Sequence, residues 1–165
     1  MQAIKIELFD LNELSEQAQE RAHQDYLSIG FEYHWIDESL DSVRAFAALF
    51  NANLTDWSLS TYSYSWLKTD IDQDKIRGIK PSEILGAFSE SNWLTGYCLD
   101  CSLLQGFKKH LEQKPGDVLG AFNNAIDTAL TDIIADMEYQ ESFEAFAESS
   151  EANEWQFREN GEFWH

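Results

Sequence analysis

The chain has 165 residues, of which 44% are hydrophobic and 14% are aromatic. This apolar content is enough for a buried core and excludes a chain that is disordered throughout, and the 2 prolines and 8 glycines exclude collagen-like and linker-like sequences. Thirty acidic residues against 11 basic ones give a formal net charge of −19. This charge excludes a general phosphate-binding surface and predicts no direct binding of nucleic acid.

The first third of the chain predicts one strand and two helices. Apolar residues alternate with others from Ile4 to Leu8, which predicts an N-terminal strand with one buried face. Ser15 is a predicted N-cap, and the helix after it is expected to end near Gly30. After Trp35, apolar residues recur every three or four positions and predict an amphipathic helix: Ile36, Leu40, Val43, Ala47 and Phe50.

The middle of the chain changes to a period of two. Trp57–Lys68 predicts strand, with a bulge or turn in its serine-rich part because twelve residues is long for one strand. We expect a loop over Asp70–Lys80, a short helix over Pro81–Phe88 and a short strand over Thr95–Leu99. Apolar spacing then predicts a helix that includes Leu103–Leu111.

The C-terminal region predicts a long helix, a break and a hairpin. Asp117 is the predicted cap of the long helix, whose apolar face loses its phase near Tyr139. One straight helix cannot bury both the glutamates and the phenylalanines that follow, so a kink or a new helix is expected at residues 139–142. Asn160-Gly161 between two aromatic segments predicts a β-hairpin. The element order favours an α+β fold with helices on a small antiparallel sheet, in one domain of residues 1–165.

The cysteine motif Cys98-Leu99-Asp100-Cys101 permits three interpretations. The thiols are structural, or they form half of a zinc site with His110 and a second histidine, or they are a redox pair. In a strand the two side chains would face opposite sides, which argues against joint chelation. The metal candidates Cys98, Cys101 and His110 are therefore weak, and no cofactor is predicted.

The sequence also lacks the motifs of common enzyme classes. It contains no HExxH, no GxSxG and no phosphate-binding glycine loop, so a protein without catalytic activity is predicted. The first residues lack a long apolar run, so no signal peptide is expected, and no segment reaches the roughly 20 apolar residues of a membrane span. These features predict a cytoplasmic protein with reduced thiols and no membrane contact.

Negative charge is concentrated in the subregion 117–165, which has 12 acidic residues and one basic residue. Four glutamates there are spaced by three, four and three positions, which places them along one side of a helix. Their mutual repulsion opposes helix stability, and a basic partner would relieve it. The predicted partner-binding residues are Asp132, Asp136, Glu141, Glu144, Glu148, Glu151 and Glu154.

Several segments resemble small acidic proteins of bacterial phages, prophages and plasmids that are often labelled antitoxin-like. The resemblance spans nearly the whole chain and is carried by Phe9–Ser15, Ser63–Asp70, Arg77–Lys80, Thr95–Cys101, Asp136–Gln140 and Asn153–Gly161. It implies an accessory protein of a mobile element and supplies no catalytic motif. Such proteins often bind and block host complexes that handle nucleic acids.

The leading hypothesis is therefore an inhibitor of a basic, nucleic-acid-binding host defence complex. In its most specific form the protein is an anti-CRISPR-like inhibitor whose acidic surface mimics nucleic acid and competes for lysines and arginines. The first alternative is an antitoxin that neutralises a cognate toxin. The second is a thiol or zinc protein centred on Cys98 and Cys101.

Overall fold

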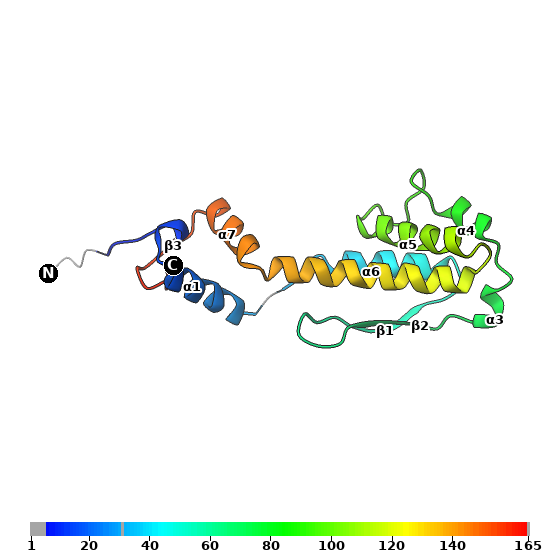
Figure 1. Cartoon of the computed structure of the whole chain (residues 1–165), viewed down its shortest axis with the longest axis horizontal. Helices are drawn as coiled ribbons and strands as arrows, with labels where there is room; N and C mark the ends of the chain where they lie inside the picture. The colour runs from blue at the N-terminus through cyan, green and yellow to red at the C-terminus, as the bar shows by residue number, and fades with distance from the viewer. Residues whose placement is uncertain (1–5, 31, 165) are drawn as a thin grey trace. The chain divides into compact units, whose positions relative to one another are not determined.

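The computed structural model describes residues 6–30 and 32–164. Within these residues the chain forms seven α-helices, a short 3-10 helix and two two-stranded antiparallel sheets, so the fold is α+β (Figure 1). No helix in the described part combines the length and the apolar character that crossing a membrane requires.

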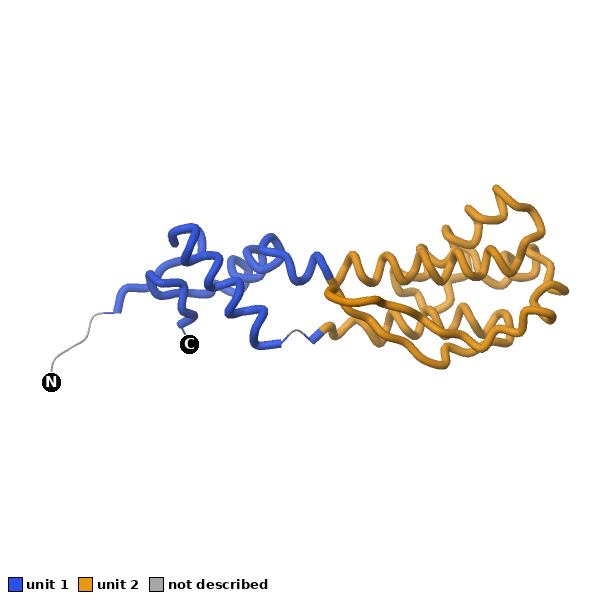
Figure 2. Tube along the Cα trace, turned by 60° about the horizontal axis from the view of Figure 1, so that its bottom comes forward, with its two compact units in different colours: residues 1–32, 138–165 blue, residues 33–137 orange. Residues whose placement is uncertain are grey.

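The chain divides into two compact units (Figure 2). Unit 1 consists of residues 1–32 and 138–165, and unit 2 of residues 33–137. The single-domain hypothesis stays a prediction. The acidic subregion 117–165 is divided by the boundary between the units, so its charges do not all belong to one of them.

Unit 2 is built around the helices α2 (Ile36–Ala48), α5 (Leu99–Gln113) and α6 (Val118–Gln140). The three-and-four spacing in α2 buries its apolar face, as predicted. Phe46 stacks on Phe122 with ring centroids 5.6 Å apart, and Phe50 and Phe107 complete an aromatic centre. Burial of these large rings stabilises unit 2.

A hairpin packs on this helical core. Strands β1 (Leu54–Ser58) and β2 (Trp66–Thr69) pair antiparallel, with an irregular register between Leu54 and Asp56. The predicted strand Trp57–Lys68 is interrupted in its serine-rich part, where a bulge or turn is expected, because residues 59–65 connect β1 to β2. Tyr62 and Tyr64 in that segment are each 83% exposed. The predicted 70–80 loop contains a single helical turn, α3 (Gln73–Ile76). Helix α4 (Pro81–Ala87) begins at Pro81, as predicted.

Unit 1 joins the two ends of the chain. The 3-10 helix η1 (Leu11–Glu13), α1 (Glu16–Ser28), α7 (Phe143–Ala152) and the hairpin β3 (Gln156–Phe157) and β4 (Phe163–Trp164) surround a small core. That core consists of Leu11, Leu14, Ala18, Ala22, Phe146 and Phe157. The Ser15 cap and the C-terminal hairpin are confirmed.

Two strand predictions fail. Ile4 and Lys5 lie outside the described residues, while Ile6–Leu8 form no strand and only Phe9 makes a β-bridge, with Phe157. Residues 95–98 form bends and a turn that lead into α5 in place of the predicted strand. The buried Asp100 carboxylate accepts hydrogen bonds from the Thr95 and Gly96 amides, at 2.8 and 3.0 Å, and these bonds fold the segment back on itself.

The predicted break at residues 139–142 is confirmed. Helix α6 ends at Gln140, and α7 begins at Phe143 with the Ser142 hydroxyl accepting the Ala145 amide at 3.2 Å. Because α7 is a separate helix with its own cap, Phe146 enters the core of unit 1 while the glutamates of α7 stay exposed. The start of a new helix thus resolves the conflict between the two sets of side chains.

Candidate functional site

Unit 1 contains a groove between α7, η1 and the start of the C-terminal hairpin. Its volume is about 850 Å³. Glu144, Glu148 and Glu151 line it from α7, and Glu154 lines it from the turn after that helix. Four of the seven predicted partner-binding residues therefore lie around one groove.

The glutamates are positioned by the regular spacing of α7 and by the turn that ends it. Residues three and four positions apart share one side of a helix, so Glu144, Glu148 and Glu151 point the same way. Glu154 follows with φ 53°, in the left-handed region, and the Trp155 amide donates to the Ser150 carbonyl at 2.9 Å. This turn brings Glu154 and Trp155 to the same groove.

The cations of the described residues form no ion pair with these four groove glutamates. Arg158 pairs with Glu162 at 3.3 Å and Arg21 with Asp25 at 3.7 Å. By composition, unit 1 has 15 acidic and 3 basic residues, a net charge of −12. The groove therefore lies in the unit that carries more negative charge per residue.

Tyr139 contacts one of the groove glutamates. Its hydroxyl donates to Glu148 Oε2 at 2.8 Å. This hydrogen bond, together with burial and the charges of Glu148 and Glu144, raises the pKa of Tyr139 above its ordinary value of 10.0. The tyrosine holds one glutamate in place without neutralising it.

Four apolar side chains also line the groove, and together they are called its apolar floor. Leu11, Phe143, Ala147 and Trp155 line it alongside the glutamates, and Phe143 is 38% exposed. Beneath them, the Phe146 ring packs on Trp155 at a centroid distance of 6.2 Å. A groove lined by both apolar and acidic side chains suits a ligand that offers both a hydrophobic side chain and positive charge.

The other predicted residues lie elsewhere. Glu141 is half-buried ahead of α7, and its carbonyl oxygen accepts a hydrogen bond from His23 Nε2 at 2.9 Å. Asp132 and Asp136 lie on α6 in unit 2; Asp132 accepts a hydrogen bond from the Ser102 hydroxyl, and burial raises the pKa of Asp136. The structure does not bring these three residues into the groove.

Sequence reasoning missed the part of the groove that comes from the N-terminal segment. Asp10, Leu11 and Asn12 line the groove from η1 and the residue before it. The η1 turn is tied to α1 by Gln19, whose side-chain amide donates to the Leu11 and Leu14 carbonyls at 3.0 and 3.2 Å. No local pattern connects these residues with α7, although Phe9–Ser15 belongs to the resemblance described for the sequence.

The cysteine motif lies at the start of α5. Cys98 is the N-cap and Cys101 lies in the first turn, so the opposed-face argument based on a strand does not apply. His110 is nine residues beyond Cys101 on the same helix, which is about 13 Å along its axis. Its Nε2 lies 2.8 Å from Asp117 Oδ2. His110 therefore cannot complete a zinc site with the thiols, and the described residues contain no cluster of three or more metal-ligating side chains.

Comparisons of the chain with protein-family models, curated proteins and solved structures gave no match.

Proposed function

We propose that this chain is a binding protein that holds a basic segment of a partner protein in the acidic groove of unit 1. The observation that carries the proposal is the combination of four glutamates and an apolar floor in one groove, with no ion pair to those glutamates among the described residues. A partner segment with lysines or arginines beside one large apolar residue matches both features.

The two features contribute differently to binding. The net charge of −12 on unit 1 attracts a cationic partner over distances of about 8–10 Å at moderate ionic strength, so it acts mainly on the association rate. The floor formed by Leu11, Phe143 and Trp155 offers apolar surface that an inserted side chain would remove from water. Affinity should therefore fall with salt without disappearing.

Binding of this kind would inhibit a nucleic-acid-handling partner by competition. Lysines and arginines that hold phosphates are the groups that the groove glutamates would engage. The specific form of the proposal is an anti-defence, anti-CRISPR-like protein of a mobile element, which follows from the sequence resemblance. The antitoxin alternative stays a prediction, because a toxin with a basic, partly apolar segment would fit the same groove.

A titration with defined peptides tests the groove directly. The full chain is titrated calorimetrically, at low and high salt, with a lysine- and arginine-rich peptide that contains one tryptophan, and with the same peptide carrying serine in place of the tryptophan. We expect the tryptophan peptide to bind at least about fivefold more tightly at both salt concentrations. Equal affinity of the two peptides would show that the apolar floor does not take part.

Matched charge variants separate the groove from general electrostatics. The triple variant Glu144→Gln, Glu148→Gln, Glu151→Gln removes three groove charges, and Glu16→Gln, Glu20→Gln, Glu159→Gln removes three exposed charges of unit 1 outside it. We expect the first to weaken binding at least about tenfold and the second by less than about threefold. Equal losses would contradict the proposal.

The partner-level test is inhibition. With a purified basic nucleic-acid-binding protein that the chain captures, the unmodified chain should displace nucleic acid and the groove triple variant should not. Capture of a toxin with no nucleic-acid-binding surface would favour the antitoxin alternative instead.

A further inference from the structure

The two cysteines of the chain lie in one tight turn. Cys98 has φ −58° and ψ −28°, which are the angles of a 3-10 turn, and the Cys101 amide donates to the Cys98 carbonyl at 3.1 Å. In a turn of this kind the side chains of residues three apart lie one above the other. Both cysteines are exposed and neither is in a disulfide. From the spacing of the turn we expect the two thiols to lie near each other at the surface of unit 2.

A buried carboxylate holds this turn rigid. Asp100, between the cysteines, is 1% exposed and accepts the Thr95 and Gly96 amides at 2.8 and 3.0 Å and the Thr95 hydroxyl at 3.2 Å. The Thr95 hydroxyl also lies 2.9 Å from that of Ser42 on α2. Gly96, with φ 81°, supplies the bend that these bonds require. The relative position of the thiols is therefore set by the fold.

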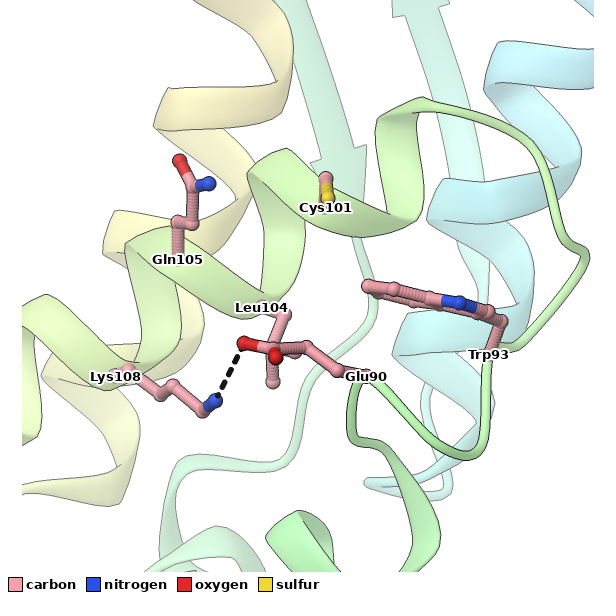
Figure 3. A pocket seen from close by; sticks show the side chains of 6 residues that line it. All are labelled: Glu90, Trp93, Cys101, Leu104, Gln105 and Lys108. Atoms are coloured by element: carbon pink, nitrogen blue, oxygen red, sulfur yellow. Dashed lines mark ion pairs between the residues drawn. The ribbon is translucent and has the colours of Figure 1, made fainter.

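A pocket of about 310 Å³ adjoins one of the thiols. Cys101 and Leu104 line it from α5, and Trp93 lines it from the loop after α4 (Figure 3). The Lys108 ammonium, which pairs with Glu90 at 3.6 Å, lies at the same pocket (Figure 3). The pocket combines an aromatic wall with one cation and one anion, so it can hold a small zwitterionic molecule next to the Cys101 thiol.

We propose that Cys98 and Cys101 form a reversible dithiol–disulfide site that exchanges with low-molecular-weight disulfides of the glutathione type. The Cys101 thiolate attacks one sulfur of the small disulfide, forms a mixed disulfide and releases one small thiol. Cys98 then attacks the Cys101 sulfur, forms the Cys98–Cys101 bond and releases the second small thiol. Two protein thiols are oxidised, one disulfide is reduced, and the two thiol protons pass to the two released thiols.

The turn should favour the second step. Two thiols held together react as if each were present at very high concentration, so ring closure on the mixed disulfide is expected to be fast. Because the chain has only 2 cysteines, no other intramolecular disulfide competes. The site lies in unit 2 and does not depend on the groove proposed for partner binding.

Equilibration with glutathione tests the site. The full chain is incubated at low protein concentration with mixtures of oxidised and reduced glutathione, and the reaction is quenched in acid. Remaining thiols are then labelled with a maleimide, and the mass of the intact chain is measured by mass spectrometry. We expect that, in oxidising mixtures, neither cysteine takes up maleimide and the mass of the chain falls by two hydrogen atoms. A reducing dithiol should restore both thiols completely. Persistence of both labels in the most oxidising mixture, or disulfide-linked dimers in place of the internal bond, would overturn the proposal.

Two comparisons show whether the fold creates the site. The equilibrium constant for the internal disulfide should be at least about tenfold larger in the folded chain than in the same chain in urea, because the turn pre-positions the thiols. A ratio of one or less would mean that the fold does not favour the bond. In the single variants, glutathione should add several times faster to Cys101 in Cys98→Ser than to Cys98 in Cys101→Ser. The reverse order would overturn the role of the pocket.

Discussion

Replacing Gly161 by alanine tests how unit 1 is held together. Gly161 lies buried in the turn between β3 and β4, with φ 85°, and its amide donates to the Arg158 carbonyl at 2.9 Å. A Cβ built at this position would collide with the backbone carbonyl of Ala18 in α1. The turn can therefore approach α1 this closely only because residue 161 has no side chain.

The expected loss has two parts. A residue with a Cβ lowers the free energy of unfolding by roughly 1–2 kcal/mol when its backbone is in the left-handed region. A collision with backbone atoms, which cannot move aside as a side chain can, adds about 1–3 kcal/mol. Alanine recovers about 0.4–1 kcal/mol by restricting the unfolded chain. We expect Gly161→Ala to destabilise unit 1 by about 2–4 kcal/mol, a large part of the typical stability of ~5–15 kcal/mol for a domain.

Gly30→Ala is the matched control. Gly30 has φ 93° in the same unit, but a Cβ there meets nothing within 4 Å, so the collision is absent. The backbone cost, reduced by the gain from restricting the unfolded chain, leaves a net loss of about 0.5–1 kcal/mol. Amide hydrogen exchange is the assay, with the Phe157 amide, which donates to the Phe9 carbonyl at 2.9 Å, reporting on unit 1. Equal exchange of this amide in the two variants would refute the close-approach argument.

Two further predictions concern the acidic residues Asp117 and Glu154. The hydrogen bond from His110, followed by that from the Gly120 amide, lowers the pKa of Asp117 below its ordinary value of 3.8. The ionised form thus stabilises the fold above the unfolded-state pKa, and this contribution is lost as the pH falls through the lowered folded pKa. Asp117→Asn should therefore lose less stability than the unmodified chain as the pH falls below the ordinary Asp value of 3.8 in urea titrations, and parallel losses would contradict the assignment. Glu154→Gly should stabilise unit 1 by about 0.5–1 kcal/mol by relieving the left-handed φ, while weakening binding of the basic peptide severalfold. The control Glu154→Gln should weaken peptide binding to the same extent without raising thermal stability. If both variants raised thermal stability, relief of backbone strain would not be the cause.

The groove shows how far sequence reasoning reached into the site. The spacing of Glu144, Glu148 and Glu151 is sufficient by itself to place three acidic groups on one side of a helix. Asp132 and Asp136 belong to unit 2, because α6 and α7 are separate helices. Helical spacing predicts which charged residues share one side only within a single continuous helix.

Local patterns sufficed wherever a segment's structure depends on its neighbours in sequence. The apolar spacing of α2, the caps at Ser15 and Asp117, the break near residue 140 and the Asn160-Gly161 turn all follow from interactions within a few residues.

Contacts between distant segments decided the remaining features. The position of Leu11 beside α7 depends on packing between segments from opposite ends of the chain. The alternation at Thr95–Leu99 resembles a strand, yet the burial of Asp100 against the core requires partners for its carboxylate, and the nearby amides supply them by folding into a turn. Burial makes such hydrogen bonds obligatory, and which residues are buried depends on the assembled fold.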